Sequence, residues 1–393
     1  MAVGVTCIWL AALLALCSAQ DCSRYPCDSG CNMGVAPCNG LIFEDTFDSF
    51  DLYTWEHEIT GGGGGNWEFQ FYINNRTNSY TRDGILYLKP TLAEDTYGEG
   101  WAQYGTLNLW GSSPANLCTG HAWWGCERSA DGVNNYVNPI QSARIRTVNS
   151  FGFTYGKVEV SAKLPRGDWI WPAIWLLPVN NGYGEWPASG EIDLLESRGN
   201  RNYYDWEGTS LGVDHMGSTM HWGPFYPYNA YYLTQGLKHA PNGEDYGTKF
   251  HKYVVEWTST DISFFLDDEL VVRVDPGQGG FYDFGGFPTQ IPNTDNPWEN
   301  SPNKMAPFDQ DFHLIMNVAV GGTGGYFHDS ITNEPYPKPW SDSSGTAPRD
   351  FWLAKDLWYP TWNPTERNGE DAAMHVDYVR VWADGTYTPT PIP

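Results

Sequence analysis

The chain has 393 residues, of which 41% are hydrophobic and 18% charged, a balance that excludes a disordered protein. Its net charge of -25 at pH 7 disfavours nucleic acid and anionic lipid as partners and suits a neutral one. Aromatic residues make up 16% of the chain; such rings can fill a core, but exposed rings are also suited to stacking on sugars.

The first element in the chain is a candidate export signal. Residues 8–17 form an unbroken apolar run, and the small residues Ser18 and Ala19 follow it. This pattern predicts a signal peptide over residues 1–19, although no Lys or Arg precedes the run. No later segment has 18 consecutive apolar residues. We therefore expect a secreted, extracellular protein without a membrane-spanning helix.

A cysteine-rich segment is expected at residues 20–40, and two further cysteines lie in a Trp-rich loop. Of the eight cysteines, six lie beyond the predicted signal peptide, and an even number in an exported chain predicts disulfides. The spacing of the first four fits zinc poorly and leaves their connectivity open. Asn75 begins the sequence Asn-Arg-Thr, an acceptor for glycosylation. The six cysteines are Cys22, Cys27, Cys31, Cys38, Cys118 and Cys126.

Residues 41–385 are expected to form one all-β body, followed by a Pro/Thr tail at 386–393. In segment 157–164, apolar side chains alternate with polar ones, which predicts a strand with one buried face. Segment 253–274 predicts two strands around an Asp-Asp turn. Segment 313–320 predicts a buried strand.

Segment 376–382 predicts a closing strand, and no segment has a long helical period. Many strands between Gly, Pro and Asn turns predict a β-sandwich or jelly roll. Long aromatic-rich loops at 95–135, 200–245 and 276–310 are expected to build a cleft on it.

Three carboxylates stand close together in the sequence Gly190-Glu191-Ile192-Asp193-Leu194-Leu195-Glu196. On a regular strand Glu191 and Asp193 would share one face, and Glu196 would lie on the opposite, buried face. A lone buried glutamate is costly. We therefore expect a β-bulge at Leu194-Leu195, which turns Glu196 to the face of the other two acids.

This arrangement suits the hydrolysis of glycosidic bonds. The bulged spacing would bring the carboxyls of Glu191 and Glu196 to the roughly 5–5.5 Å of a retaining glycosidase. Three adjacent acids raise the pKa of at least one of them, as a general acid requires. The residues alone leave open which glutamate is the nucleophile. A solvated acidic edge or a calcium site is the alternative interpretation.

The motif at 190–196 closely resembles the signature of glycoside hydrolase family sixteen, laminarinase branch. The resemblance covers roughly residues 41–382, and it implies a β-jelly-roll sandwich of two antiparallel sheets with a concave substrate cleft. It also implies retaining endo-hydrolysis of β-1,3-glucan. Further segments resemble the family in chain order: 155–160, 169–178, 185–189, 220–223, 312–322 and 377–382.

The resemblance implies that Glu191 is the nucleophile and Glu196 the acid/base, with Asp193 assisting. Animal relatives include digestive glucanases and immune glucan-recognition proteins, many of which have lost the glutamates. All three acids are present here. The main prediction is therefore a hydrolase. A non-catalytic β-1,3-glucan recognition protein and a transglycosylase are the alternatives.

Three tryptophans are candidate sugar-binding residues. Trp171 and Trp175 lie four apart on a predicted strand, and hence on one face. They predict a stacking platform in the cleft, with core packing as the alternative. Trp186 begins the approach to the acidic strand and is also expected to face the cleft.

Polar sugar contacts are predicted at Asn74 and Arg144, which match family positions; for Arg144 an ion pair is the alternative. His221 is expected on a strand beside the acids, where it would contact the sugar or tune Glu191. A structural histidine is the alternative.

No cofactor is expected for catalysis. A structural calcium on the convex face is a further expectation from the resemblance, with oxygen ligands from Glu44, the carbonyl of Gly84, and Asp377. The expected partner is β-1,3-glucan polysaccharide, without nucleic acid or membrane. We expect a monomer.

Overall fold

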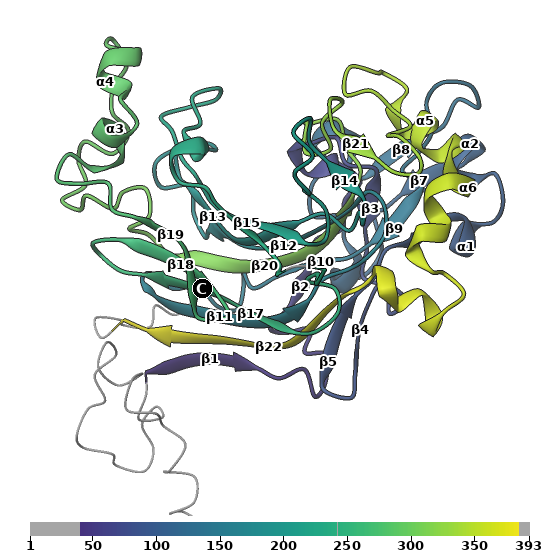
Figure 1. Cartoon of the computed structure of the whole chain (residues 1–393), viewed down its shortest axis with the longest axis horizontal. Helices are drawn as coiled ribbons and strands as arrows, with labels where there is room; N and C mark the ends of the chain where they lie inside the picture. The colour runs from purple at the N-terminus through teal and green to yellow at the C-terminus, as the bar shows by residue number, and fades with distance from the viewer. Residues whose placement is uncertain (1–39, 242, 385–393) are drawn as a thin grey trace, which may run out of the picture.

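The computed structural model describes residues 40–241 and 243–384. Two antiparallel β-sheets pack against each other, and the sheet on the open side of Figure 1 is concave. We call this the inner sheet and the other the outer sheet. The predicted all-β jelly-roll sandwich is confirmed. The predicted signal peptide (1–19), the tail (386–393), and Cys22, Cys27, Cys31 and Cys38 lie outside the described residues.

The two main sheets hold most of the strands. In spatial order, the outer sheet consists of β19 (Glu269–Val274), β18 (Ile262–Leu266), β17 (His251–Trp257), β11 (Gly156–Lys163), β22 (Met374–Ala383), β5 (Ile85–Leu88) and β4 (Ser79–Arg82), with β1 (Leu41–Asp45) also paired to β22. The inner sheet consists of β16 (Gly236–His239), β15 (His215–His221), β13 (Glu191–Ser197), β12 (Ile170–Pro178), β20 (Phe312–Val320), β10 (Arg144–Arg146) and β2 (Glu56–His57).

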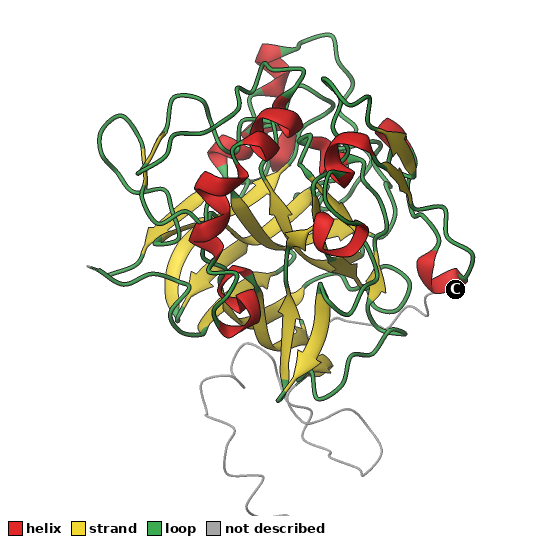
Figure 2. Cartoon of the chain, turned by 90° about the vertical axis from the view of Figure 1, so that its right-hand side faces the viewer, coloured by secondary structure: helices red, strands yellow, loops and turns green. Residues whose placement is uncertain are grey.

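Most of the short elements gather at one end of the sandwich, which Figure 2 shows face on, whereas α3 and α4 lie at the opposite end in Figure 1. The smaller sheets are β3 (Gln70–Tyr72), β9 (Ile140–Ser142) and β6 (Thr91–Leu92); β7 (Thr106–Asn108) and β8 (Glu127–Ser129); and β14 (Tyr203–Tyr204) and β21 (Thr332–Asn333). The α-helices are α1 (Glu94–Tyr97), α2 (Trp101–Tyr104), α3 (Gly280–Phe284), α4 (Phe287–Gln290), α5 (Ala347–Leu353) and α6 (Lys355–Trp358). Within the described chain, no helix has the length and apolar character needed to span a bilayer.

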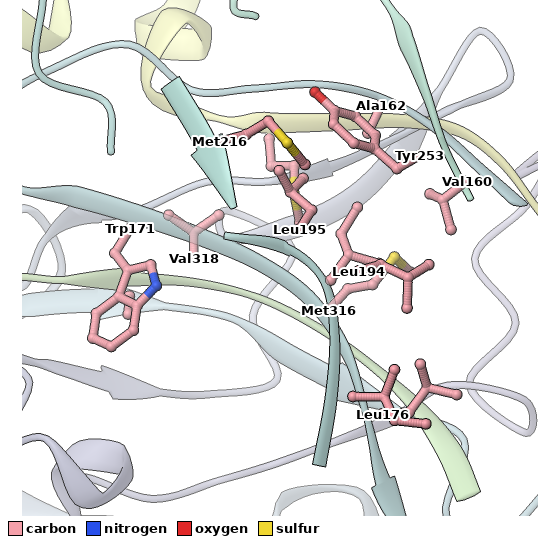
Figure 3. Close-up of a cluster of buried hydrophobic side chains, with 14 of the residues drawn as sticks. Val160, Ala162, Trp171, Leu176, Leu194, Leu195, Met216, Tyr253, Met316 and Val318 are labelled. Carbon is pink, nitrogen blue, oxygen red and sulfur yellow. The ribbon is translucent and has the colours of Figure 1, made fainter. Parts of the chain in front are cut away.

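The core lies between the two sheets. Figure 3 shows Val160, Ala162 and Tyr253 of the outer sheet near Leu195 and Met316 of the inner sheet. All five are buried, as expected for the apolar face predicted at 157–164. Each large apolar side chain buried in this way contributes roughly 1.5–3 kcal/mol.

The segment 253–274 forms three strands (β17–β19) rather than the two expected. The additional turn lies between β17 and β18, where the Thr258 backbone N–H donates to the Asp261 carbonyl and the Thr258 hydroxyl donates to the Asp261 carboxylate at 2.7 Å. The predicted Asp267-Asp268 turn joins β18 to β19. Both residues have positive φ, of 48° and 69°, which Asp tolerates in hairpin turns.

The predicted calcium ligands have other partners. Glu44 accepts from the Arg380 guanidinium at 2.7 Å, and Asp377 accepts from the Ser161 hydroxyl at 3.3 Å. Gly84 lies in the turn between β4 and β5. The Arg380 guanidinium already neutralises Glu44, so the contacts of these residues do not support the calcium site. The calcium stays a prediction.

Candidate active site

A groove of about 1010 Å³ lies over the inner sheet. Its floor comes from β12, β13, β15 and β20, and loops at 64–68, 181–190 and 324–326 add to its walls. The sequence-predicted residues that line it are Arg144, Trp171, Trp175, Trp186, Glu191, Asp193, Glu196 and His221.

A β-bulge in β13 brings the acids to one face. Across from β12, Trp175 pairs with Asp193 but Ile174 pairs with Leu195, so Leu194 is the additional residue. The pairing with β15 shifts in the same interval. Leu194 and Leu195 are both buried in the core. The predicted bulge is confirmed, and all three acids line the groove.

Gly190 fixes the start of this strand. Its φ of +84° is a left-handed conformation, and a Cβ atom there would lie 2.8 Å from a ring carbon of Phe308. A larger residue would therefore be strained twice, by its backbone and by this contact. The glycine lets the chain enter β13 with Glu191 facing the groove.

Each acid contacts one ring N–H group. Trp186 Nε1 donates to Glu191 at 2.6 Å, and Trp171 Nε1 donates to Glu196 at 3.1 Å. Asp193 Oδ2 lies 3.3 Å from Nε2 of His221. The carboxylates are thus oriented by side chains from β12, the loop before β13, and β15.

The acids are close enough to affect one another's protonation. One carboxylate oxygen each of Glu191 and Asp193 and one ring nitrogen of His221 all lie within 4.8 Å of one another. Burial, followed by the charge of Glu191, raises the pKa of Asp193 well above its usual range. Burial also raises the pKa of Glu196, and outweighs the lowering by His221 and by the Trp171 hydrogen bond. Both groups therefore favour protonated forms more than an exposed acid does.

His221 is subject to opposing influences. Burial lowers its pKa, but the contact with Asp193 and the charges of the three acids together raise it to about 10. Asn229 opposes this charge, because its amide nitrogen lies 2.8 Å from His221 Nδ1 and favours a neutral ring. The Asn229 oxygen accepts two long hydrogen bonds, of 3.3 Å, from the backbone N–H groups of Trp222 and Tyr231. The three acids are the stronger influence, and they favour the imidazolium.

The tryptophans line the groove in different ways. Trp171 is only 8% exposed and stacks on Tyr326, with ring centroids 3.7 Å apart. It therefore has little free ring surface and acts mainly on Glu196. Trp175 donates to Asn317 at 2.8 Å. Trp186 is 40% exposed and offers the largest free ring of the three.

Arg144 lies in the groove and also forms the ion pair considered as its alternative. Its Nε is 2.9 Å from a Glu58 oxygen, and its guanidinium lies 4.5 Å from the Trp175 ring centroid. Burial lowers its pKa, but the charge of Glu58 and further negative groups raise it overall.

Asn74 does not line the groove. It follows β3, where its amide donates to the Ala115 carbonyl at 3.0 Å and its oxygen accepts from Arg76. Instead, Asn66 lines the groove, directly after the five-glycine loop. Its position directly after that loop is the sequence signal that marks it.

Further groove residues were missed, among them Arg198 and Tyr326. Arg198 lies two residues after Glu196, so strand alternation could have placed it on the same side. Its guanidinium lies 4.0 Å from the ring centroid of Tyr326. Tyr326 itself lies in a loop whose sequence carried no comparable signal.

The loop at 276–310 does not line the groove, contrary to expectation. It packs around Trp222, the residue that follows β15. Phe281, Phe287 and Trp298 of this loop surround the buried ring of Trp222. Of the three loops expected to build the cleft, that at 200–245 contributes, through Tyr226, Tyr231 and Gln235.

A jelly-roll sandwich with carboxylates in an open groove on its concave sheet is an arrangement shared with glycoside hydrolases. Residues 126–296 match the model of "Glycosyl hydrolases family 16". A solved laminarinase from Rhodothermus marinus is similar, with 28% identity and a TM-score of 0.50, covering 87% of this chain and 96% of that one.

Curated relatives extend the match over most of the chain. The β-1,3-glucan-binding protein of Penaeus monodon is 50% identical over 365 residues, which cover 92% of each chain. The β-1,3-glucan-binding protein 1 of Manduca sexta is 33% identical, over 91% of this chain and 69% of that one. The chain belongs to glycosyl hydrolase family 16.

Proposed function

We propose that this protein is a secreted retaining endo-hydrolase that binds β-1,3-glucan in the groove. The observation that carries the proposal is the bulge in β13, which brings Glu191, Asp193 and Glu196 to the groove surface. The family and the names of the relatives support the ligand. They do not distinguish binding from hydrolysis.

In the proposed reaction, Glu196 donates its proton to the glycosidic oxygen while Glu191 attacks the anomeric carbon. The bond to the leaving sugar breaks, and a covalent glycosyl-enzyme forms on Glu191. Glu196, now ionised, takes a proton from water, which displaces Glu191 and restores both groups. The raised pKa of Glu196 suits the first step. The His221 imidazolium lies beside Asp193 and balances the negative charge of the acids.

A recognition protein without turnover is the second candidate function. The specific observation in its favour is that the curated relatives described above are named for binding β-1,3-glucan. The intact acids favour hydrolysis, since binding alone does not require an acid/base pair. A transglycosylase would use the same acids, with a sugar hydroxyl in place of water.

The test separates binding from turnover. Laminarin is incubated with wild-type protein and with Glu191→Gln, and new reducing ends and product lengths are measured together with binding to insoluble β-1,3-glucan. We expect the substitution to reduce turnover by a factor of about 10³ or more, because it removes the nucleophile, while binding persists. Proton NMR of early digests should show the β-anomer first.

Other outcomes select the other candidates. Wild-type protein that binds glucan but releases no reducing ends is a recognition protein. Products longer than the substrate, without net new reducing ends, identify a transglycosylase. Equal turnover in wild type and Glu191→Gln would overturn the assignment of the nucleophile.

A further inference from the structure

We propose a second carbohydrate-binding site beside the groove, which takes a neutral β-linked glucan chain. It is a pocket of about 660 Å³ on the side of the molecule where Figure 1 shows β8 and α5. The inference rests on the ligand proposed above but not on hydrolysis. The pocket residues that the argument uses are Trp67, Trp124, Arg128, Asn138 and Gly345.

The pocket and the groove share a wall. Gly61, Gly62 and Gly63 line the pocket, whereas Gly64, Gly65 and Asn66 of the same loop line the groove. Glu68 lines both cavities. A long polysaccharide in the groove therefore has the pocket within reach across one short loop.

Two exposed tryptophans, Trp67 and Trp124, line this pocket, and a third, Trp123, contacts the ring of Trp67. Trp67 is 49% exposed, Trp123 57% and Trp124 67%. The rings of Trp67 and Trp123 meet edge to face, with centroids 5.1 Å apart. Such an exposed apolar group marks a binding surface more often than it serves stability.

The backbone holds these rings in conformations that bulky residues rarely adopt. The φ angles are +53° at Trp67 and +58° at both Trp123 and Trp124. Such strain persists where surrounding contacts enforce it, which is typical of ligand-binding positions. The loop conformation therefore holds these rings at the surface.

The contacts that enforce the loop are specific. The Cys118–Cys126 disulfide closes it. Arg128 donates to the carbonyl of Trp123 at 2.6 Å and points Nε toward that of Trp124 at 3.5 Å. The Gly61 backbone N–H donates to the Gly125 carbonyl at 2.7 Å, which ties the loop to the wall of the groove.

An unsatisfied acceptor lies in the pocket. Asn138 is 3% exposed and donates its amide to the Gln70 carbonyl at 2.9 Å, but its Oδ1 has no hydrogen-bond partner among the described residues. A buried carbonyl oxygen of this kind is costly unless a donor reaches it. The oxygen is covered in this structure, so a sugar hydroxyl supplies such a donor once the Asn138 side chain turns towards the pocket.

The remaining lining matches a neutral, hydroxylated ligand. Its polar groups are mainly amides and hydroxyls: Ser129, Asn134, Asn135, Thr323, Ser343 and Ser344. Of the charged groups, Glu68 accepts from the Gln70 side-chain amide, Arg128 is engaged with the loop carbonyls, and Asp342 forms an ion pair with Lys338. Rings beside amides and hydroxyls bind sugar faces and sugar hydroxyls, respectively.

The experiment uses Glu191→Gln protein, so that the glucan stays intact, and compares binding to insoluble β-1,3-glucan with binding to a short laminari-oligosaccharide. We expect Trp123→Ala/Trp124→Ala to weaken binding to the insoluble polymer about fivefold or more and to leave oligosaccharide binding unchanged. The matched control is Trp206→Ala, since Trp206 is 83% exposed and lies in neither cavity. It should change neither measurement.

A second variant changes a different segment of the pocket lining, residues 342–345. A Cβ at Gly345 meets no atom within 4 Å, so Gly345→Glu should fold normally and place bulk and charge in the pocket. It should reproduce the loss of polymer binding. Unchanged polymer binding in this variant overturns the second site while leaving the groove proposal intact. Absence of any glucan binding by the Glu191→Gln parent overturns both.

Discussion

Among single residues, the ring N–H groups on the acids have consequences for pH dependence. Trp171 donates to Glu196, and this hydrogen bond lowers the pKa of that carboxyl against the larger effect of burial. Trp175 lies on the same strand, but its N–H is directed to Asn317. The two tryptophans therefore form a matched pair for a test of how Glu196 is tuned.

We expect Trp171→Phe to shift the alkaline limb of the pH profile of kcat/KM on laminarin to higher pH. The substitution removes a hydrogen bond to the ionised carboxylate, so the pKa of Glu196 rises and the acid stays protonated further into the alkaline range. Trp175→Phe should leave that limb in place. A limb that moves equally in both variants, or in neither, would contradict this role for Trp171.

At the scale of elements, the bulge in β13 depends on one residue. Inserting one Ala after Leu194 would shift the following residues by one position in the alternation and turn Glu196 towards the core. We expect the insertion to abolish hydrolysis and to lower the melting temperature. Leu194→Ala keeps the residue count, so it should retain hydrolysis while losing about 2–5 kcal/mol of stability from the cavity.

Melting temperature and laminarin turnover of the two variants check this prediction. Retained hydrolysis after the insertion would show that the residue count across the bulge does not position Glu196. Equal loss of hydrolysis in Leu194→Ala would show that packing, rather than the residue count, controls the acid.

The bulge was predictable because the face of a strand residue follows from its position in the alternation, and a lone buried glutamate is costly. Strand 157–164 was predictable for the same reason of alternation. Asn74 was misplaced because side chains in a loop have no periodicity that fixes their direction. The second turn in 253–274 depends on a hydrogen bond between Thr258 and Asp261, which the alternation of strand residues does not reveal.

The partners within the site could not be predicted. Asn229 reaches His221, and Tyr326 covers Trp171, across loops that lie far apart in the sequence or fold back on themselves. Such contacts depend on how the loops pack over the sheet. The residue types show that rings and amides are available, but not which of them meet.

For the whole molecule, buried neutral histidines link stability to pH. Burial lowers the pKa of His57, His215 and His313 to about 3 and that of His375 to about 4. In the unfolded chain, each would titrate near pH 6.5. Their contribution to stability is therefore present above about pH 6.5 and is lost as the pH falls towards 3. Acids with raised pKa, such as Asp168, oppose this trend.

His313 offers a direct test, because a single variant isolates its share of the pH dependence. Its pKa is lowered first by burial and then by the charges of Arg146 and Arg144. We expect His313→Gln to reduce the slope of unfolding free energy against pH, between about 6 and 4, by up to about 1.4 kcal/mol per pH unit. Urea unfolding at several pH values measures the slope. An identical slope in wild type and variant would mean that His313 is protonated in the folded protein.

The glycine loop between the two cavities has a consequence for turnover. A polymer held on both sides of that loop gains from the high effective concentration that the first contact gives to the second. A fragment too short to cross the loop gains nothing. The protein would then release its own short products readily while holding the polymer they came from, and the fragments would compete poorly for the groove as digestion proceeds.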